Sequence, residues 1–258
     1  MAPLKLHWSH SKPNFGDWLS PLICEYLSGR PIVHAEFSSC DLVAVGSLLQ
    51  RATEHFWNRR VEVWGTGHIA ARAPAPSRHH YHALRGPLSA ACITNHSVQV
   101  FGDPGLLVDR VFGPSKPQRR TRLGIVPHYR DQEDGSIAAL AAGISGSRII
   151  DVFDPPPSVV AQIASCDFVV SSSLHGLVVA DSYRVPNCWL KVSDRQRGEG
   201  FKYADYYGAF GLDAPEPLRI EDSLPTLDDI ATHIGDCRRE ELETLKDALC
   251  TCFPFLPR

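Results

Sequence analysis

The chain has 258 residues, with 26 Lys and Arg against 29 Asp and Glu and a formal net charge of −3. This balance argues against a general nucleic-acid binder, which carries a strong basic excess. The content of 21% charged and 43% hydrophobic residues excludes a disordered chain. The length suits one large domain or two of roughly 110–140 residues.

Short apolar stretches alternate with helical ones through the first half of the chain. Strands are expected at residues 4–8, 31–34, 41–45, 61–64, 80–84 and 98–101, and helices at residues 21–27, 46–52 and 87–94. Ser20 is placed to cap the first helix, Pro21 to open it and Gly29 to follow its end. Residues 113–122 are polar, basic and broken by proline, which predicts a domain boundary.

The same rhythm restarts after this boundary. Strands are expected at residues 122–127, 148–152, 167–171 and 186–192, and helices at residues 136–143, 157–165 and 174–183. A long or broken helix over residues 226–250 is expected to pack back on the first half. Apolar strands that alternate with helices indicate parallel sheets covered on both faces. We predict two α/β domains, residues 1–113 and 121–258, with a cleft between the carboxyl ends of their strands.

The eight cysteines and the N-terminus bear on the compartment. No CxxC pair occurs, and most cysteines have apolar neighbours, which predicts buried, reduced thiols. Residues 1–8 lack the apolar region of a secretory signal, and no run approaches the ~20 apolar residues of a membrane span. We expect a cytoplasmic protein. Arg119, Arg120 and Arg122 would be available to anionic lipid, although a solvated linker explains them more simply.

The strongest candidate site follows the predicted strand at residues 167–171. Three serines, Ser171, Ser172 and Ser173, end this strand, and a helix then opens with His175 in its first turn. Backbone N–H groups and hydroxyls there form an anion cradle. The helix end disfavours a protonated histidine, but a bound phosphate or carboxylate favours it, so the ligand itself would charge a general acid. The alternative is a capping serine followed by a structural histidine.

A second candidate follows the first strand. Asn14 and Gly16 suit a tight loop, and the polar groups would face the same cleft. Asp17 is either the cap of the next helix or a base that orients a substrate hydroxyl. Because Ser20 is expected to cap that helix, Asp17 is left available for chemistry.

Weaker candidates lie at other predicted strand ends and in one aromatic segment. Arg85 precedes a helix that begins with proline, a place for bidentate binding of carboxylate or phosphate. His128 ends the first strand of the second domain and is expected to project into the cleft. Lys202 lies among the aromatic residues 201–207, which are either an acceptor-sugar surface or a packed helix.

The histidines at residues 79–82 suggest a metal site, but the pattern does not complete one. His80 and His82 share one face of a strand, while His79 points away. No cysteine or carboxylate nearby in the sequence adds a third ligand, so we expect no metal.

Four motifs carry a resemblance that covers the chain from Asn14 to about Tyr207. They are Asn-Phe-Gly-Asp at residues 14–17, Arg-Gly-Pro-Leu-Ser at 85–89, Gly-Asp-Pro-Gly-Leu-Leu at 102–107 and Ser-Ser-Ser-Leu-His-Gly at 171–176. In this order and spacing the chain resembles the polysaccharide pyruvyl transferase family, nearest to its short bacterial branch that forms ketals on exopolysaccharides. The resemblance implies two Rossmann-like domains in a GT-B-like arrangement with an interdomain cleft.

The resemblance also implies a reaction and its residues. Phosphoenolpyruvate is the co-substrate, without another cofactor, and a sugar, expected on a lipid-linked oligosaccharide at the inner-membrane surface, is the acceptor. His175 would protonate the methylene carbon and Asp17 would orient or deprotonate the attacking hydroxyl. The residues expected to bind the donor are Asn14, Gly16, Arg85, His128, Ser172, Ser173 and Lys202. Many relatives carry arginine where this chain has Ser173. If that arginine binds the donor, another cation replaces it here, and the candidates are Arg85, Lys202 and Arg130.

Two other functions remain open from the sequence. A nucleotide-sugar glycosyltransferase would share the two-domain layout and bind a pyrophosphate at the serine-rich helix start. A non-catalytic sugar- or phosphate-binding partner in polysaccharide assembly would need none of the reactive groups, and the set of Asn14, Asp17 and His175 argues against it.

Overall fold

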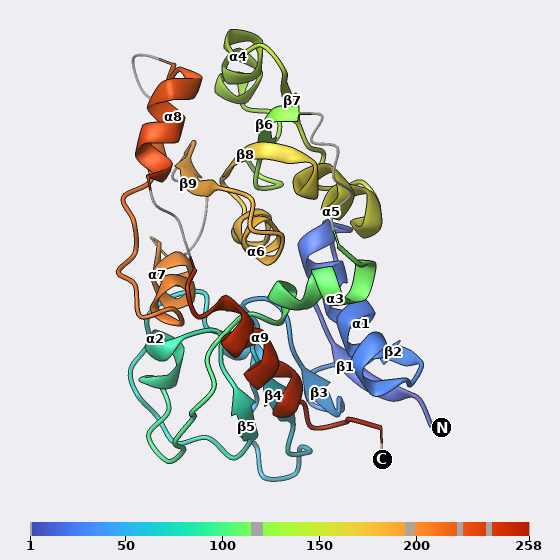
Figure 1. The fold of residues 1–258 in the computed structure, drawn as a ribbon. Coiled ribbons are helices and arrows are strands. Elements are labelled where there is room, and N and C mark those ends of the chain that lie inside the picture. The colour runs from blue at the N-terminus through green and yellow to red at the C-terminus, as the bar shows by residue number, and fades with distance from the viewer. Residues whose placement is uncertain are drawn as a thin grey trace.

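The computed structural model describes residues 2–114, 121–193, 198, 200–220, 224–235 and 239–257. Within them lie two five-stranded sheets, in the orders β2-β1-β3-β4-β5 and β10-β9-β8-β6-β7 (Figure 1). All strand pairs in both sheets are parallel. The predicted α/β class with two parallel sheets is therefore confirmed. Most of the predicted boundary, residues 115–120, lies outside the described residues.

The strands are short, at two to six residues each. The first sheet contains β1 (Leu4–His7), β2 (Ile32–His34), β3 (Leu42–Val43), β4 (Glu62–Trp64) and β5 (His80–Ala83). The second contains β6 (Thr121–Val126), β7 (Ser147–Ile149), β8 (Cys166–Ser171), β9 (Asn187–Lys191) and β10 (Leu218–Arg219). The predicted strand at residues 98–101 is wrong, because only an isolated bridge joins Phe101 to Leu84.

Helices connect and cover the strands. They are α1 (Phe15–Ser28), α2 (Pro87–Ala90), α3 (Val108–Phe112), α4 (Gly135–Gly143), α5 (Pro156–Ala164), α6 (Leu174–Ser182), α7 (Phe201–Gly208), α8 (Leu227–Ile234) and α9 (Leu242–Thr251), with 3-10 turns η1 (Leu49–Arg51) and η2 (Pro104–Leu107). The helix predicted at residues 46–52 is reduced to η1. Gly46 precedes it with φ +104, a conformation that no α-helix contains. Among the described residues, no helix is long and apolar enough to cross a membrane.

The start of α1 differs from the prediction. Asn14, not Ser20, is its N-cap, and the Asn14 side chain accepts a hydrogen bond from the backbone N–H of Asp17. Pro21 lies inside the helix, while Gly29 ends it in the left-handed conformation as expected. The longer helix buries an apolar face that begins at Phe15, and this burial outweighs the local signal of a serine before a proline.

The predicted helix at residues 226–250 is divided into α8 and α9. Helix α8 packs near β9 of the second sheet, whereas α9 lies against the first sheet (Figure 1). There the indole Nε1 of Trp64 donates to the carbonyl of Leu249 at 3.0 Å, and the ring of Phe253 lies 4.8 Å from that of Trp64. The expectation that the C-terminal helix packs back on the first domain is confirmed for α9.

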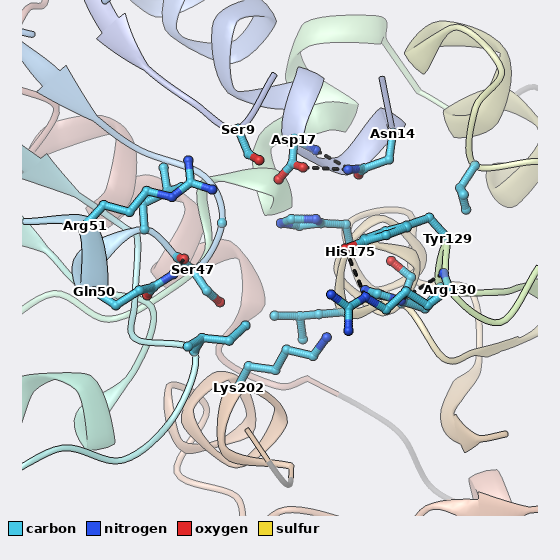
Figure 2. A pocket seen from close by; sticks show the side chains of 17 residues that line it. Ser9, Asn14, Asp17, Ser47, Gln50, Arg51, Tyr129, Arg130, His175 and Lys202 are labelled. Atoms are coloured by element: carbon cyan, nitrogen blue, oxygen red, sulfur yellow. Dashed lines mark hydrogen bonds between the residues drawn. The ribbon is translucent and has the colours of Figure 1, made fainter. Parts of the chain in front are cut away.

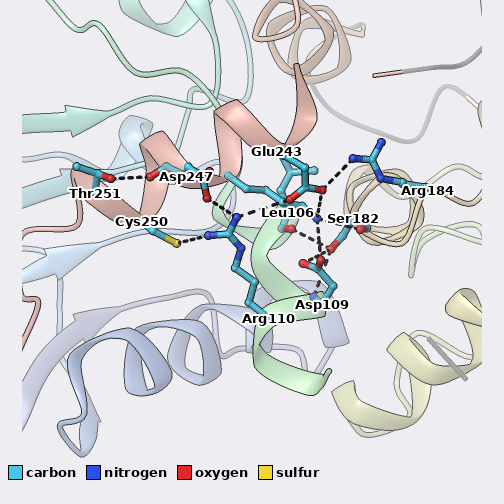
Figure 3. A network of polar contacts seen from close by, with 10 residues as sticks. Leu106, Asp109, Arg110, Ser182, Arg184, Glu243, Asp247, Cys250 and Thr251 are labelled. Carbon is cyan, nitrogen blue, oxygen red and sulfur yellow. Dashed lines mark hydrogen bonds and ion pairs between the residues drawn. The ribbon is translucent and has the colours of Figure 1, made fainter. Parts of the chain in front are cut away.

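A polar network fixes α9 to both halves of the molecule (Figure 3). The ammonium group of Lys246, which is fully buried, donates to Asp109 of α3 at 2.8 Å and to the carbonyl of Ser182 at the end of α6 at 3.0 Å. Arg110 of α3 forms an ion pair with Asp247 at 2.6 Å. Because the network binds the far end of α6, it helps to hold the start of that helix in place.

Candidate active site

A pocket of about 320 Å³ lies between the two sheets (Figure 2). The segments that follow β1, β3, β6 and β8 all reach it, so it lies at the carboxyl ends of strands, as predicted. The polar side chains that line it are Ser9, Asn14, Asp17, Ser47, Gln50, Arg51, His128, Tyr129, Arg130, Ser173, His175 and Lys202.

His175 is the second residue of α6 and lies near the centre of the pocket (Figure 2). Its position depends on the end of β8. The hydroxyl of Ser171 donates to the carbonyl of Val126 at 2.9 Å and accepts from the N–H of Ser173 at 3.0 Å, which turns the chain into the helix. A Cβ on Gly176 would lie 2.2 Å from this hydroxyl, so only glycine fits there. These contacts fix the Ser-Leu-His-Gly segment and with it the position of the imidazole.

Two residues of the first sheet's half contact or face the imidazole of His175. A Cβ on Gly16 would lie 2.2 Å from Nδ1, so α1 can approach the imidazole this closely because Gly16 has no side chain. On the other side, Nε2 lies 3.9 Å from Oδ2 of Asp103. Both atoms are buried, and neither hydrogen-bonds to another group in the described part of the chain. The ring is thus held between α1 and the start of η2.

Burial and charge set the protonation of the pocket. Burial, and then the positive charges of Lys202 and Arg85, lower the pKa of His175 to about 3. Burial lowers the pKa of Lys202 to about 8 and raises the pKa of Asp17 to about 6, although its hydrogen bond from Asn14 opposes this rise. At neutral pH the empty pocket therefore holds a neutral imidazole and a largely charged ammonium group. A bound anion would raise the pKa of His175, because opposite charge favours the protonated form.

His128 lies at the same pocket and is neutral for the same reasons. Burial, and then the charge of Lys202, lower its pKa to about 4. Its backbone N–H donates to the hydroxyl of Ser172 at 2.8 Å, and Ser172 in turn donates to Asp131 at 3.0 Å. Ser172 is fully buried and does not line the pocket, so its role is to position the segment that carries His128.

Comparison with known proteins identifies the family of the chain. A sequence model of the polysaccharide pyruvyl transferase family matches residues 3–194. The chain belongs to the polysaccharide pyruvyl transferase family. The matched range includes Asp17, Asp103 and His175 but ends before Lys202.

Two curated proteins are similar to the chain. It is 26% identical over 209 residues to the succinoglycan biosynthesis protein ExoV of Rhizobium meliloti (strain 1021), a match that covers 80% of this chain and 64% of that protein. The chain therefore spans less than two thirds of that relative. It is 24% identical over 263 residues to the uncharacterized protein L143 of Acanthamoeba polyphaga mimivirus, covering 92% of this chain and 89% of that one.

Solved structures with a distant likeness are glycosyltransferases. One is SnogD from Streptomyces nogalater, with a TM-score of 0.43 and 12% identity over 90% of this chain and 72% of that chain. Another is the E. coli ADP-heptose lps heptosyltransferase II, with a TM-score of 0.35 and 12% identity over 97% and 99% of the two chains.

The pocket of this pyruvyl transferase family member contains most, but not all, of the residues expected from the sequence. Asn14, Asp17, His128, Ser173, His175 and Lys202 line it. Gly16 and Ser172 do not, although both position side chains that do. Arg85 does not line it either.

The expected contact of Arg85 with the donor needs correction, because its guanidinium group is bound within the protein. Arg85 is fully buried, its Nε donates to Asp205 of α7 at 3.0 Å, and its Nη1 donates to Ser47 at 2.6 Å. Asp205 also accepts from the N–H and the hydroxyl of Ser89, at 2.8 and 2.6 Å. The Arg-Gly-Pro-Leu-Ser motif thus anchors α7, the helix that carries Lys202.

Sequence reasoning missed Arg51 and Gln50, which follow β3 and line the pocket. In Figure 2, Arg51 lies across the pocket from Tyr129 and Arg130. The sequence predicts a regular helix for this segment, which gives its polar side chains no role in a site. The position of this segment after a strand of a parallel sheet could have indicated a role in the site, because the loops at that end of such sheets form ligand sites. Arg130 also lines the pocket. The sequence suggests it only as one of three cations that could replace the arginine that relatives carry at the position of Ser173.

The histidines of β5 lie beside a carboxylate of the neighbouring strand. His80 and His82 lie on one face of the strand, as predicted, and both contact Glu62 of β4, at 3.0 and 2.6 Å. Glu62 is not near these histidines in the sequence, and the pairing of β4 with β5 brings it to them from 18 and 20 residues away. Throughout the described ranges, no group of three or more His, Cys, Asp or Glu side chains is arranged to hold a metal ion.

Proposed function

We propose that the chain transfers a pyruvyl group from phosphoenolpyruvate to a saccharide of an exopolysaccharide or cell-surface polysaccharide precursor and closes it as a ketal. The observation that carries the proposal is His175, which faces a small pocket together with Asp17 and with the cations Arg51, Arg130 and Lys202. Membership in the polysaccharide pyruvyl transferase family supports the same chemistry.

The size and charge of the pocket suit the donor. Its volume of about 320 Å³ is at the lower end of ligand pockets, which span roughly 300–1,000 Å³. Phosphoenolpyruvate is a small molecule with a phosphate and a carboxylate. The cationic side chains would bind these anions. The amino ends of α1 and α6, whose N-caps are Asn14 and Ser173, add the positive ends of two helix dipoles.

Binding of the donor would prepare His175 as an acid. The neutral imidazole of the empty pocket takes up a proton when the anion is bound. His175 then transfers this proton to the methylene carbon of phosphoenolpyruvate, and an oxocarbenium ion forms at the adjacent carbon. A sugar hydroxyl attacks this carbon and gives its proton to the carboxylate of Asp17.

The same two residues complete the ketal. The bond between carbon and the phosphate oxygen breaks, phosphate leaves with the electron pair, and Asp17 returns its proton to the leaving phosphate. The second sugar hydroxyl attacks the carbon and gives its proton to His175, which is again ready for the next cycle. Protons therefore balance without a further acid or base: one reaches the methyl group and one leaves with phosphate.

The test uses the whole chain with phosphoenolpyruvate and candidate lipid-linked oligosaccharides. We expect phosphate release that depends on the acceptor, and a mass increase of the acceptor by one pyruvyl unit. H175A should abolish both while the melting temperature stays near that of the wild type. Full activity of H175A would refute its assignment as the acid. Thermal stabilisation by nucleotide sugars but not by phosphoenolpyruvate would instead favour a glycosyltransferase.

A further inference from the structure

A second, larger cavity borders the pocket. This groove has a volume of about 1170 Å³ and lies between Leu88 of α2, in the first sheet's half, and β9, α7 and β10 of the second. Lys202 lines both the pocket and the groove. Ile69 lines the pocket, and the next residue, Ala70, lines the groove. The two cavities therefore meet at Lys202 and at the segment of Ile69 and Ala70, which follows β4.

Two stacked aromatic side chains, Trp189 and Tyr203, line the groove. Trp189 of β9 stacks one face on Tyr203, with ring centroids 4.1 Å apart and planes 17° apart. Tyr203 is 2% exposed, and its hydroxyl donates to the carbonyl of Ser172 at 2.7 Å, which fixes the stack. Gly200 approaches the indole closely, since a Cβ there would lie 3.1 Å from the ring. Trp189 is half-buried and lines the groove, so part of its indole is accessible to a ligand.

The rim of the groove is polar and carries both signs of charge. Arg219 on the edge strand β10 is paired in register with Lys191 of β9, and Glu216 lies nearby on the same side of the groove. Sugar hydroxyls donate to carboxylates and accept from cations, so such a rim suits a neutral polyhydroxylated ligand. Glu216 would repel a second phosphate-bearing ligand.

The size of the groove points to more than one sugar residue. Its volume, about 1170 Å³, is more than three times that of the pocket, about 320 Å³, and exceeds the roughly 1,000 Å³ of a large small-molecule site. Saccharide rings present an apolar face that packs against flat aromatic side chains. An aromatic floor, a mixed-charge rim and this volume together match an oligosaccharide.

We propose that the groove binds the acceptor saccharide, with one sugar ring against Trp189 and its hydroxyls at Lys191, Glu216 and Arg219. This inference rests on the proposed function and adds where the acceptor lies. The reacting sugar is at the Lys202 junction, next to the donor, and the preceding sugars extend along the groove away from His175.

Kinetics of groove variants test the proposal. W189L and R219Q should raise the KM for the acceptor, by about tenfold or more for W189L, because an aromatic stacking contact contributes about one factor of ten in affinity. The KM for phosphoenolpyruvate should change by less than about twofold. Since Arg219 is exposed, R219Q keeps the test valid if W189L fails to fold. The matched control is R148Q, an exposed arginine on β7 at the opposite edge of the same sheet, which should leave both constants unchanged.

A binding measurement separates this inference from the proposed reaction. In the H175A background, a panel of glucose-, galactose- and mannose-containing tetrasaccharides is titrated at up to millimolar concentration while tryptophan fluorescence is followed. We expect at least one to quench the signal, and the quenching to disappear in W189F. If a saccharide quenches the fluorescence but the wild type transfers no pyruvyl group, the proposed reaction is wrong and the saccharide site in the groove stands. The groove proposal is overturned if transfer occurs with unchanged acceptor KM in W189L and R219Q, if no saccharide quenches, or if only nucleotides do.

Discussion

Nε2 of His175 and Oδ2 of Asp103 face each other at 3.9 Å across the boundary between the two halves of the molecule. Asp103 is the N-cap of η2, and its other oxygen accepts from the N–H of Gly105 at 2.8 Å. One carboxylate oxygen therefore holds the turn and the other faces the imidazole. Nε2 is buried against this carboxylate, which leaves Nδ1, beside Gly16, as the nitrogen that can act on a ligand.

This arrangement predicts the effect of D103N. Asparagine keeps the oxygen that caps η2 but removes the negative charge that favours a protonated His175. The pKa of His175 in the complex with phosphoenolpyruvate should therefore fall. Because activity is lost when this acid is deprotonated, the alkaline limb of the kcat profile should move to lower pH. An unchanged profile in a variant with a lower melting temperature would show that Asp103 acts only in folding.

G16A tests the room beside His175. An added Cβ would lie 2.2 Å from Nδ1 and 2.8 Å from the histidine Cβ, so the imidazole must move. Helix propensity alone favours alanine over glycine by about 0.5–1 kcal/mol, so the fold should survive. We expect kcat to fall at least about tenfold, since misplacement of about 1 Å costs up to 10²-fold.

The control for G16A is G135A, at the first position of α4, where an added Cβ meets no atom within 4 Å. It should leave kcat unchanged. Wild-type kcat in G16A would contradict the tight approach of α1 to the imidazole. Steady-state kinetics and thermal unfolding of both variants decide the matter.

The residues that could be predicted from the sequence are those with a local signal. His175 and Asp17 follow strands and begin helices, so their neighbours in the chain place them at the carboxyl end of a sheet. The role of Arg85 could not be predicted in this way, because its partner Asp205 is 120 residues away. The sequence places the start of this helix at residue 21, whereas α1 begins at Phe15. The reason is similar, because the burial of Phe15 depends on tertiary packing.

Lys202 gives the pocket a pH dependence above neutrality. Its pKa is lowered to about 8, by burial first and by Arg85 next, while Asp131 and Asp17 oppose the change. The ammonium must be charged to bind an anion. The KM for phosphoenolpyruvate should therefore rise as the pH increases through about 8, and K202M should raise KM at neutral pH and remove this inflection.

K5M is the control for K202M, because Lys5 is exposed on β1 and does not line the pocket. It should reproduce the wild-type dependence of KM on pH. Persistence of the inflection in K202M would assign it to another group.

The last prediction concerns the buried pair of Arg85 and Asp205, both of which have fully buried side chains. Removal of one partner leaves an unpaired buried charge, which costs about 3–5 kcal/mol. For a chain of this size that corresponds to a fall in melting temperature of roughly 6–20 °C in R85M. The variant R59M, which removes the exposed Arg59 from its pair with the half-buried Asp41, should cost at most about 1 kcal/mol.

The double variant R85M/D205L sharpens this prediction, because it removes both charges and should be less destabilised than R85M alone. If Arg85 instead bound the donor directly, R85M would raise the KM for phosphoenolpyruvate with little change in melting temperature. We expect the opposite order: a loss of stability in R85M, and a loss of activity that follows from the displacement of α7 and Lys202. Thermal unfolding and donor KM, measured on all four proteins including the wild type, distinguish the two roles.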